Sequence, residues 1–348
     1  MSDIFHGSQL ESGLFQRVRT WRDAIPSLVL VDSLRVAGSP LLVTGVWIVL
    51  GLQDWLLTRL PGGPPLFPTR VDGPFGALTL PGLPETAPLG RELIRGLLLA
   101  ALWLVPAALI ARAGACYAAG RSQTLLDHGR VVAGRWANLL MTLLIPAVAV
   151  AALAGLLVVV GIACRLGGSW SVAPILSALV ALPIATVAGT IAAGAVFAVP
   201  LAIVATVIER QPDSFDAISR GYEYLLRRPV HLALNLLGCV ALLAVIGLLA
   251  EAITRAAIGV SAYALRIGSG TDVTTAWLLP MLTRFASAVV WTAAWGLVGA
   301  TYLVMRQATS DQEVEDITVS AVDQQPPTMP SLVTKADESV SADGPSGG

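Results

Sequence analysis

The sequence predicts an all-α, polytopic helical membrane protein with about six transmembrane helices. Of its 348 residues, 55% are hydrophobic and only 13% are charged, whereas a soluble domain carries about 25% charged residues. The mean hydropathy is +0.73. Uncharged stretches recur that are long enough to cross about 30 Å of hydrocarbon, which takes roughly 20 helical residues. These features exclude an ordinary soluble enzyme, a disordered protein and a nucleic-acid binder.

The apolar runs favour helices, because membrane strands give a weaker, alternating pattern. We expect a transmembrane domain over residues 36–306, after an N-terminal segment (1–35) with an amphipathic helix and before an acidic, largely disordered tail (307–348). Nothing before Val36 resembles a signal peptide, so the first span should remain as an anchor. The expected spans are about 36–57, 93–118, 138–164, 174–199, 230–250 and 284–306.

The run 166–208 is long enough for one or two crossings. A hairpin would need a turn near Gly189 to Gly194, where no turn signal stands. We favour one crossing, a kink at Pro200, and a partly interfacial turn to Glu209. With six spans, the arginine-richer loops and both termini then share one side, which the positive-inside rule makes cytoplasmic. The expected location is the cytoplasmic (inner) membrane.

Shorter elements are expected between the spans. Residues 252–267 have the pattern of a separate amphipathic helix on the outer surface, and the Pro/Gly-rich segment 58–91 that of an irregular loop. Ser122 is a candidate N-cap of a basic helix before the third span. The order of span, basic amphipathic helix and span thus occurs at 93–164 and again at 174–250. This indicates either parallel repeats or coincidence, since the residues match poorly.

The most informative local signal lies between Asp213 and Pro229. Asp213 is a good N-cap, and Asp216 three residues later suggests a capping box. Acid-before-base pairs follow at i,i+4, and Pro229 ends the helix. An apolar stripe is expected from Phe215, Ile218, Tyr222, Leu225 and Leu226.

We interpret this segment as a cytoplasmic helix at the headgroup level. It is either a docking surface for anionic lipids or a membrane-protein partner, or a set of topology signals with no further role. The candidate surface residues are Asp213, Phe215, Asp216, Arg220, Tyr222, Tyr224, Arg227 and Arg228.

Ionisable residues within the membrane would indicate an ion or proton path, but here they fall near the ends of the spans. We expect interfacial placement for them, with Arg112 and Glu209 the best candidates for an inward position. No HExxH, GxSxG or Walker motif is present. Three cysteines and three histidines lack metal-ligand spacing. We predict no catalytic, cofactor-binding or metal-binding residues.

The string from Asp213 to Tyr224, with the Arg-Arg-Pro ending at Pro229, resembles a family of multi-pass membrane proteins of planctomycete-type bacteria. The last span, ending in Ala300–Arg306 before an acidic stretch, is similar to that family's final helix. The segment 120–146 is also similar, although Asp127-His128-Gly129 departs from the family's pattern. The resemblance covers roughly residues 30–316. It implies a helical architecture and no assigned activity. A more distant similarity is to Yip-family and phosphodiesterase-associated membrane domains.

These observations favour a non-enzymatic membrane scaffold or a subunit of a membrane complex. The alternative is a permease or lipid-handling protein with a pathway between the central helices near Gly189–Pro200. A polar cavity between the third and fifth spans would favour transport, and a packed apolar bundle would favour the scaffold.

Overall fold

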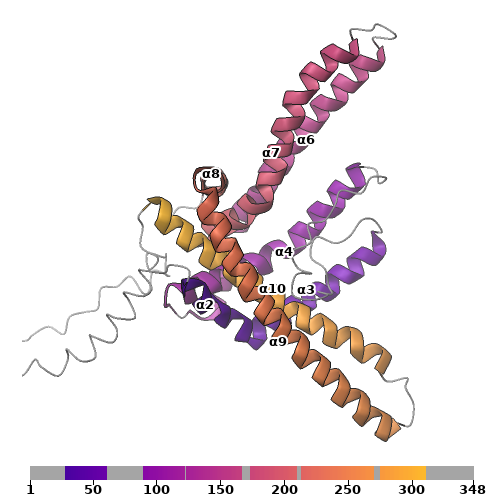
Figure 1. The fold of residues 1–348 in the computed structure, drawn as a ribbon, viewed down its shortest axis with the longest axis vertical. Helices are drawn as coiled ribbons and strands as arrows, with labels where there is room; N and C mark the ends of the chain where they lie inside the picture. Colours follow the sequence, from indigo (N-terminus) through magenta and orange to yellow (C-terminus); the bar gives the residue numbers. More distant parts are fainter. Residues whose placement is uncertain are drawn as a thin grey trace, which may run out of the picture. The chain divides into compact units, whose positions relative to one another are not determined.

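The computed structural model describes residues 28–60, 89–121, 123–166, 173–209, 213–269 and 275–310. All regular elements in these ranges are helical, and six of the helices are long and apolar enough to cross a membrane (Figure 1). The polytopic helical fold class is therefore confirmed. The order is α2 (Val29–Ser33), the 3-10 helix η2 (Leu34–Gly38), α3 (Pro40–Arg59), α4 (Leu89–Ala118), α5 (Leu125–Gly134), α6 (Trp136–Leu166), α7 (Ala173–Ile208), α8 (Ser214–Arg227), α9 (Pro229–Ser269) and α10 (Thr275–Ser310).

Helix α10 is the central helix of the described part. It packs against α2, η2, α3, α4, α7 and α9. In its most apolar stretch of 18 residues, 83% of the residues are buried. Small residues make its crossing with α4 close. A Cβ at Gly114 would lie 2.5 Å from the Cα of Gly296, and a Cβ at Gly299 would collide with the carbonyl of Ala111. Such small-residue crossings let membrane helices approach each other without a hydrophobic driving force.

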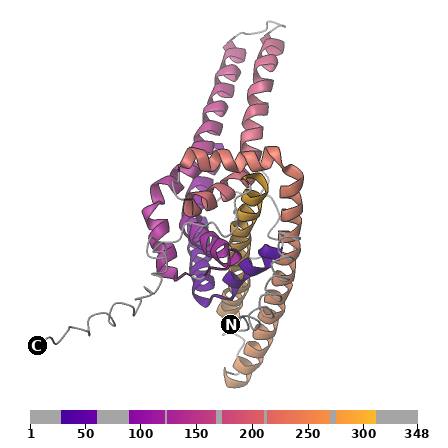
Figure 2. The same cartoon turned by 90° about the vertical axis from the view of Figure 1, so that its left-hand side faces the viewer.

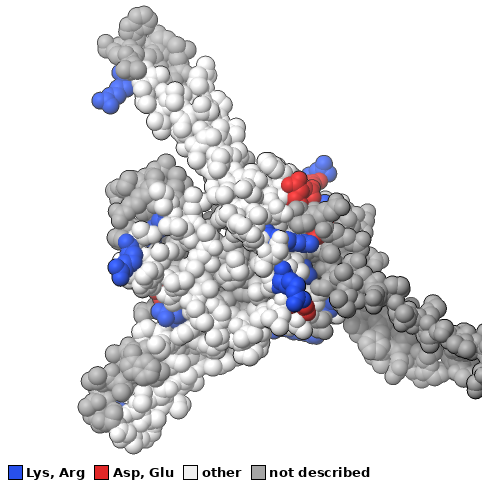
Figure 3. All heavy atoms as spheres, turned by 180° about the vertical axis from the view of Figure 1, so that it is seen from behind, with Lys and Arg blue, Asp and Glu red and all other residues white. Residues whose placement is uncertain are grey.

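Helices α6 and α7 form a hairpin whose outer part is widely exposed. Figures 1 and 2 show the two helices side by side. Only 6% of the residues in the most apolar 18-residue stretch of α6 are buried. The surface of this hairpin, at the top of Figure 3, is almost entirely uncharged along its length. Since α6 also has the highest mean hydropathy of the six, at 2.9, its exposed surface suits hydrocarbon on nearly all sides.

The run 166–208 does not end in the partly interfacial turn that we expected after Pro200. The chain crosses this stretch as one helix, but α7 continues past Pro200 to Ile208 with no interfacial turn. The part after Ala198 is the most buried portion of the helix. Pro200 is tolerated there because other groups can satisfy the backbone atoms that it frees.

Helix α9 corrects a second expectation. Residues 252–267 do not form a separate surface helix, because α9 runs without interruption for 41 residues from Pro229 to Ser269. No proline interrupts this stretch, and Glu251 pairs with Arg255 across one helical turn. An acid-before-base pair at this spacing supports continuation of a helix.

The predicted terminal segments and the first loop fall largely outside the described residues. Of the N-terminal segment 1–35, the structure describes only the end, in α2 and η2, and of the tail 307–348 only the last residues of α10. The Pro/Gly-rich loop 58–91 lies outside them at 61–88, and so does Ser122. The described N-cap of α5 is instead Thr124, whose hydroxyl accepts from the backbone N–H of Asp127 at 3.3 Å.

Candidate functional site

The helix predicted between Asp213 and Pro229 exists as α8, and Figure 2 shows it lying across the ends of the longer helices. Its N-cap is Asp213, as predicted, with the carboxylate accepting from the N–H of Phe215 at 3.1 Å. Asp216 does not complete a capping box. It accepts from Arg220 Nε at 2.9 Å, as the predicted i,i+4 pair. Arg227 pairs with Glu223 in the same way, also at 2.9 Å.

The buried face of α8 matches the predicted apolar stripe only in part: Ile218 is buried, and Tyr222 and Leu225 are partly buried against the core. Phe215 and Leu226 are 66% and 69% exposed, whereas the buried residues are Ser214, Ala217, Ile218, Gly221 and Tyr224. Gly221 explains the difference, because a Cβ there would lie 2.5 Å from the carbonyl oxygen of Ala198 on α7. The face of α8 that packs against α7 is therefore the one where the two backbones come closest, at Gly221 and Ala198, and not the one with the largest apolar side chains.

A cluster of polar side chains joins α8 to the ends of α7 and α10. We call it the Glu209 cluster. Its members are Glu209, Asp216, Arg220, Tyr302 and Arg306. The Tyr302 hydroxyl donates to Glu209 Oε1 at 2.6 Å. Arg220 Nη1 and Arg306 Nη1 lie 3.4 and 3.7 Å from the same oxygen.

The cluster is balanced in charge and partly buried. Two carboxylates face two guanidiniums, and Arg306 is only 2% exposed. Burial would lower the pKa of Arg220, but the nearby Glu209 and Asp216 carboxylates raise it overall. Arg220 therefore stays charged and keeps both carboxylates paired. The arrangement fastens three helices together, and its charges already have partners.

Two tyrosines complete the attachment of α8. The Tyr222 hydroxyl donates to the carbonyl of Ile191 on α7 at 2.7 Å, and its ring packs against Gly194. Tyr224 is 3% exposed, and its ring centroid lies 5.9 Å from that of Tyr302. Burial raises the pKa of both Tyr222 and Tyr224. Both phenols therefore remain protonated and uncharged at neutral pH.

Two arginines cap the end of α7, a feature that sequence reasoning missed in part. Arg112 of α4 donates to the carbonyl of Val207, and Arg135 donates to that of Thr206 at 2.9 Å. The last carbonyls of a helix lack intrahelical partners and carry a partial negative charge. The guanidiniums satisfy both needs, which is why α7 can end inside a packed region. Arg112 is buried, at 1% exposed, near the end of α4.

Polar groups of the other spans also contact one another. Arg284 of α10 lies 2.8 Å from Asp54 of α3 and 5.8 Å from the ring centroid of Trp47. The Trp103 indole donates to Gln53 at 2.7 Å in a buried pair. Asp54 and Arg284 thus form an ion pair that joins α3 to α10. A span-by-span reading of the sequence cannot identify such partners.

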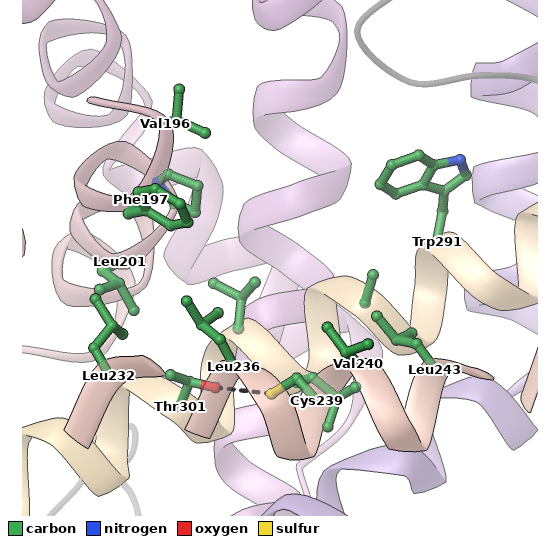
Figure 4. A pocket seen from close by; sticks show the side chains of 14 residues that line it. Val196, Phe197, Leu201, Leu232, Leu236, Cys239, Val240, Leu243, Trp291 and Thr301 are labelled. Carbon is green, nitrogen blue, oxygen red and sulfur yellow. Dashed lines mark hydrogen bonds between the residues drawn. The ribbon is translucent and has the colours of Figure 1, made fainter. Parts of the chain in front are cut away.

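An apolar crevice lies between α7, α9 and α10 (Figure 4). Its volume is about 290 Å³, near the lower end of the range for ligand pockets. The Cys239 thiol and the Thr301 hydroxyl lie 3.3 Å apart in its wall and hydrogen-bond to each other. The remaining lining is apolar: Val196, Phe197, Pro200, Leu201, Leu232, Leu236, Val240, Leu243, Trp291, Ala294, Leu297 and Val298.

Within the described residues, no group of three or more His, Cys, Asp or Glu side chains is placed to hold a metal ion. The comparisons with known proteins give no match to a family model, a curated protein or a solved structure.

Proposed function

We propose that this chain is a non-enzymatic membrane protein that acts as a scaffold or as a subunit of a membrane complex. The observation that carries the proposal is the attachment of α8. The Glu209 cluster holds this helix against α7 and α10 by charged hydrogen bonds, while Phe215 and Leu226 remain exposed. A firmly held helix with an exposed apolar and basic edge suits recognition of another molecule.

The proposed partner is a membrane protein that presents apolar and acidic side chains to this edge. Arg227 and Arg228 are exposed beside Leu226 and supply the complementary positive charge. The proposed location is the cytoplasmic (inner) membrane, with both termini in the cytoplasm. Anionic lipid headgroups at the same level are compatible with this surface. We also propose that the chain shares its helical architecture with the membrane proteins of planctomycete-type bacteria that its sequence resembles.

The test is co-purification from native membranes in a mild detergent, with a tag on the C-terminal tail and identification by mass spectrometry. The expected result is a stoichiometric protein partner that is lost from the Phe215→Ser/Leu226→Ser variant. The control is Leu126→Ser on α5, where the side chain is 80% exposed and should not matter. A protein that purifies alone, or with a partner indifferent to the α8 change, would contradict the proposal.

The second candidate function is lipid handling, and the crevice is the observation that favours it. Its polar wall groups bond to each other, so it suits hydrocarbon rather than a hydrophilic solute. Movement of a fluorescent phospholipid between the leaflets of proteoliposomes would distinguish this role. A rate above that of empty liposomes supports handling, and an equal rate supports the scaffold.

A further inference from the structure

We propose that the crevice between α7, α9 and α10 is a binding site for one acyl chain of an anionic phospholipid, whose headgroup lies at Arg228. The inference goes beyond the proposed function, because such a lipid would be a resident ligand and neither cargo nor partner. The acyl-chain site concerns the crevice and holds whether or not α8 binds a protein, whereas the headgroup assignment shares Arg228 with the proposed partner surface.

The length of the crevice fits one leaflet. Along α9 it extends from Leu232 to Leu243, which is about 16 Å at 1.5 Å per residue. The antiparallel α10 provides the same extent, from Thr301 to Trp291, as Figure 4 shows. Half of a hydrocarbon core of about 30 Å is about 15 Å. The crevice therefore spans the depth of one leaflet, starting at the end where α8 lies.

The width of the crevice fits one hydrocarbon chain. A volume of about 290 Å³ extends over a length of about 16 Å, so the crevice is narrow and elongated. A helix has an overall diameter of about 10–12 Å with its side chains, which suits a wider groove than this one. All three walls belong to candidate spans, so the opening beside Val196 and Phe197, which are 49% and 39% exposed, faces lipid.

Charge complementarity places the headgroup. On α9, the crevice residues Leu232, Leu236 and Val240 recur every four residues and share a helix face. Arg228 lies between α8 and α9, directly before the first residue of α9, and its carbonyl accepts from the N–H of Leu232. Arg228 therefore stands at the end of the crevice where α9 begins. Arg228 is exposed, and among the described residues no carboxylate lies within ion-pair distance of it, whereas its neighbour Arg227 is paired with Glu223. A phosphate one turn beyond the crevice would complete the pairing of Arg228.

The experiment uses the full chain in phosphatidylcholine vesicles doped with phosphatidylglycerol that carries a photoactivatable diazirine on one acyl chain. A parallel sample contains phosphatidylcholine with the same label. After illumination, peptide mass spectrometry locates the adducts. The expected adducts are enriched on 232–243 and 291–301, relative to the exposed α6. Equal labelling of α6 and the crevice would overturn the proposal.

Two variants sharpen the test. Ala294→Phe fills the crevice and should reduce its labelling several-fold, whereas Ala241→Phe, on the exposed side of α9, should leave it unchanged. Arg228→Gln changes an exposed side chain and keeps its length and polarity. It should reduce labelling by phosphatidylglycerol about fivefold, since one arginine near the surface is worth about 1 kcal/mol toward an anionic lipid, and leave labelling by phosphatidylcholine unchanged. If Ala294→Phe were labelled as strongly as Ala241→Phe, the acyl-chain site would be overturned. If Arg228→Gln did not reduce labelling by phosphatidylglycerol relative to phosphatidylcholine, the headgroup assignment would be overturned.

Discussion

The hydroxyl of Tyr302, near the end of the last span, donates a hydrogen bond of 2.6 Å to Glu209 Oε1, at the end of α7. The two residues are 93 positions apart in the chain. The same carboxylate oxygen also faces Arg220 of α8 and Arg306 of α10. This one atom therefore joins three helices, and its contacts fix where α8 lies.

The Tyr302 hydroxyl should contribute measurably to stability. Tyr302→Phe removes a hydrogen bond to a charged group, which typically stabilises by about 2 kcal/mol. We expect a lower free energy of unfolding in detergent, measured by denaturant titration of the helical signal. The control is Tyr263→Phe on α9, where the side chain is 71% exposed. Equal stability of the two variants would show that the Glu209 cluster does not hold the helices together.

The close crossing of α4 and α10 should not tolerate a methyl group. Gly299→Ala places a Cβ against the carbonyl of Ala111, and overpacking of this kind costs about 1–3 kcal/mol. The matched control is Gly259→Ala on α9, where nothing lies within 4 Å and the better helix propensity of alanine should be neutral or stabilising. Thermal unfolding of both variants checks the prediction, and a Gly299→Ala protein as stable as the control would contradict the described crossing.

The sequence predicted the six long helices because hydropathy and helix length depend on local composition. It also predicted the Asp213 cap and the i,i+4 pairs of α8, which are local. It did not predict the partners of Glu209, Asp54 or Arg112, because these contacts join residues far apart in the chain. The end of α7 was placed wrongly for the same reason. The guanidiniums that cap its carbonyls come from α4 and from the residue between α5 and α6, and a single apolar run gives no sign of them.

The buried histidine of α5 should make stability depend on pH. His128 is 3% exposed, and its Nδ1 has no hydrogen-bond partner among the described residues. Burial, and secondarily the nearby Arg112, lower its pKa to about 4, against the opposing effect of Asp127. Above pH 6.5 the imidazole is neutral in both folded and unfolded chains, so no stability is lost there.

As the pH falls from 6.5 to 4, the His128 imidazole binds a proton in the unfolded chain but stays neutral in the folded chain. Stability should therefore decrease, by on the order of 3 kcal/mol at most. The melting temperature measured between pH 7 and pH 4.5 checks this. His128→Gln should show a shallower decrease over that interval. Identical profiles for the two proteins would contradict the burial of this side chain.

Residues beyond the last helix should be dispensable for folding. Helix α10 is described to Ser310, and the contacts that bury it come from the other helices. Truncation after Ser320 should leave membrane insertion and the melting temperature unchanged, as judged by extraction yield and thermal unfolding. Loss of folded protein would show that the tail packs against the spans.

The central claim is that six spans place α8 and the C-terminus together in the cytoplasm. Reporter fusions test it most directly: green fluorescent protein, which is fluorescent when it folds in the cytoplasm, and alkaline phosphatase, which is active outside. Each is joined in turn after Arg227, after Ser269 and after Ser310. The account predicts fluorescence without phosphatase activity after Arg227 and Ser310, and the reverse after Ser269. Phosphatase activity after Arg227 or Ser310 would contradict it.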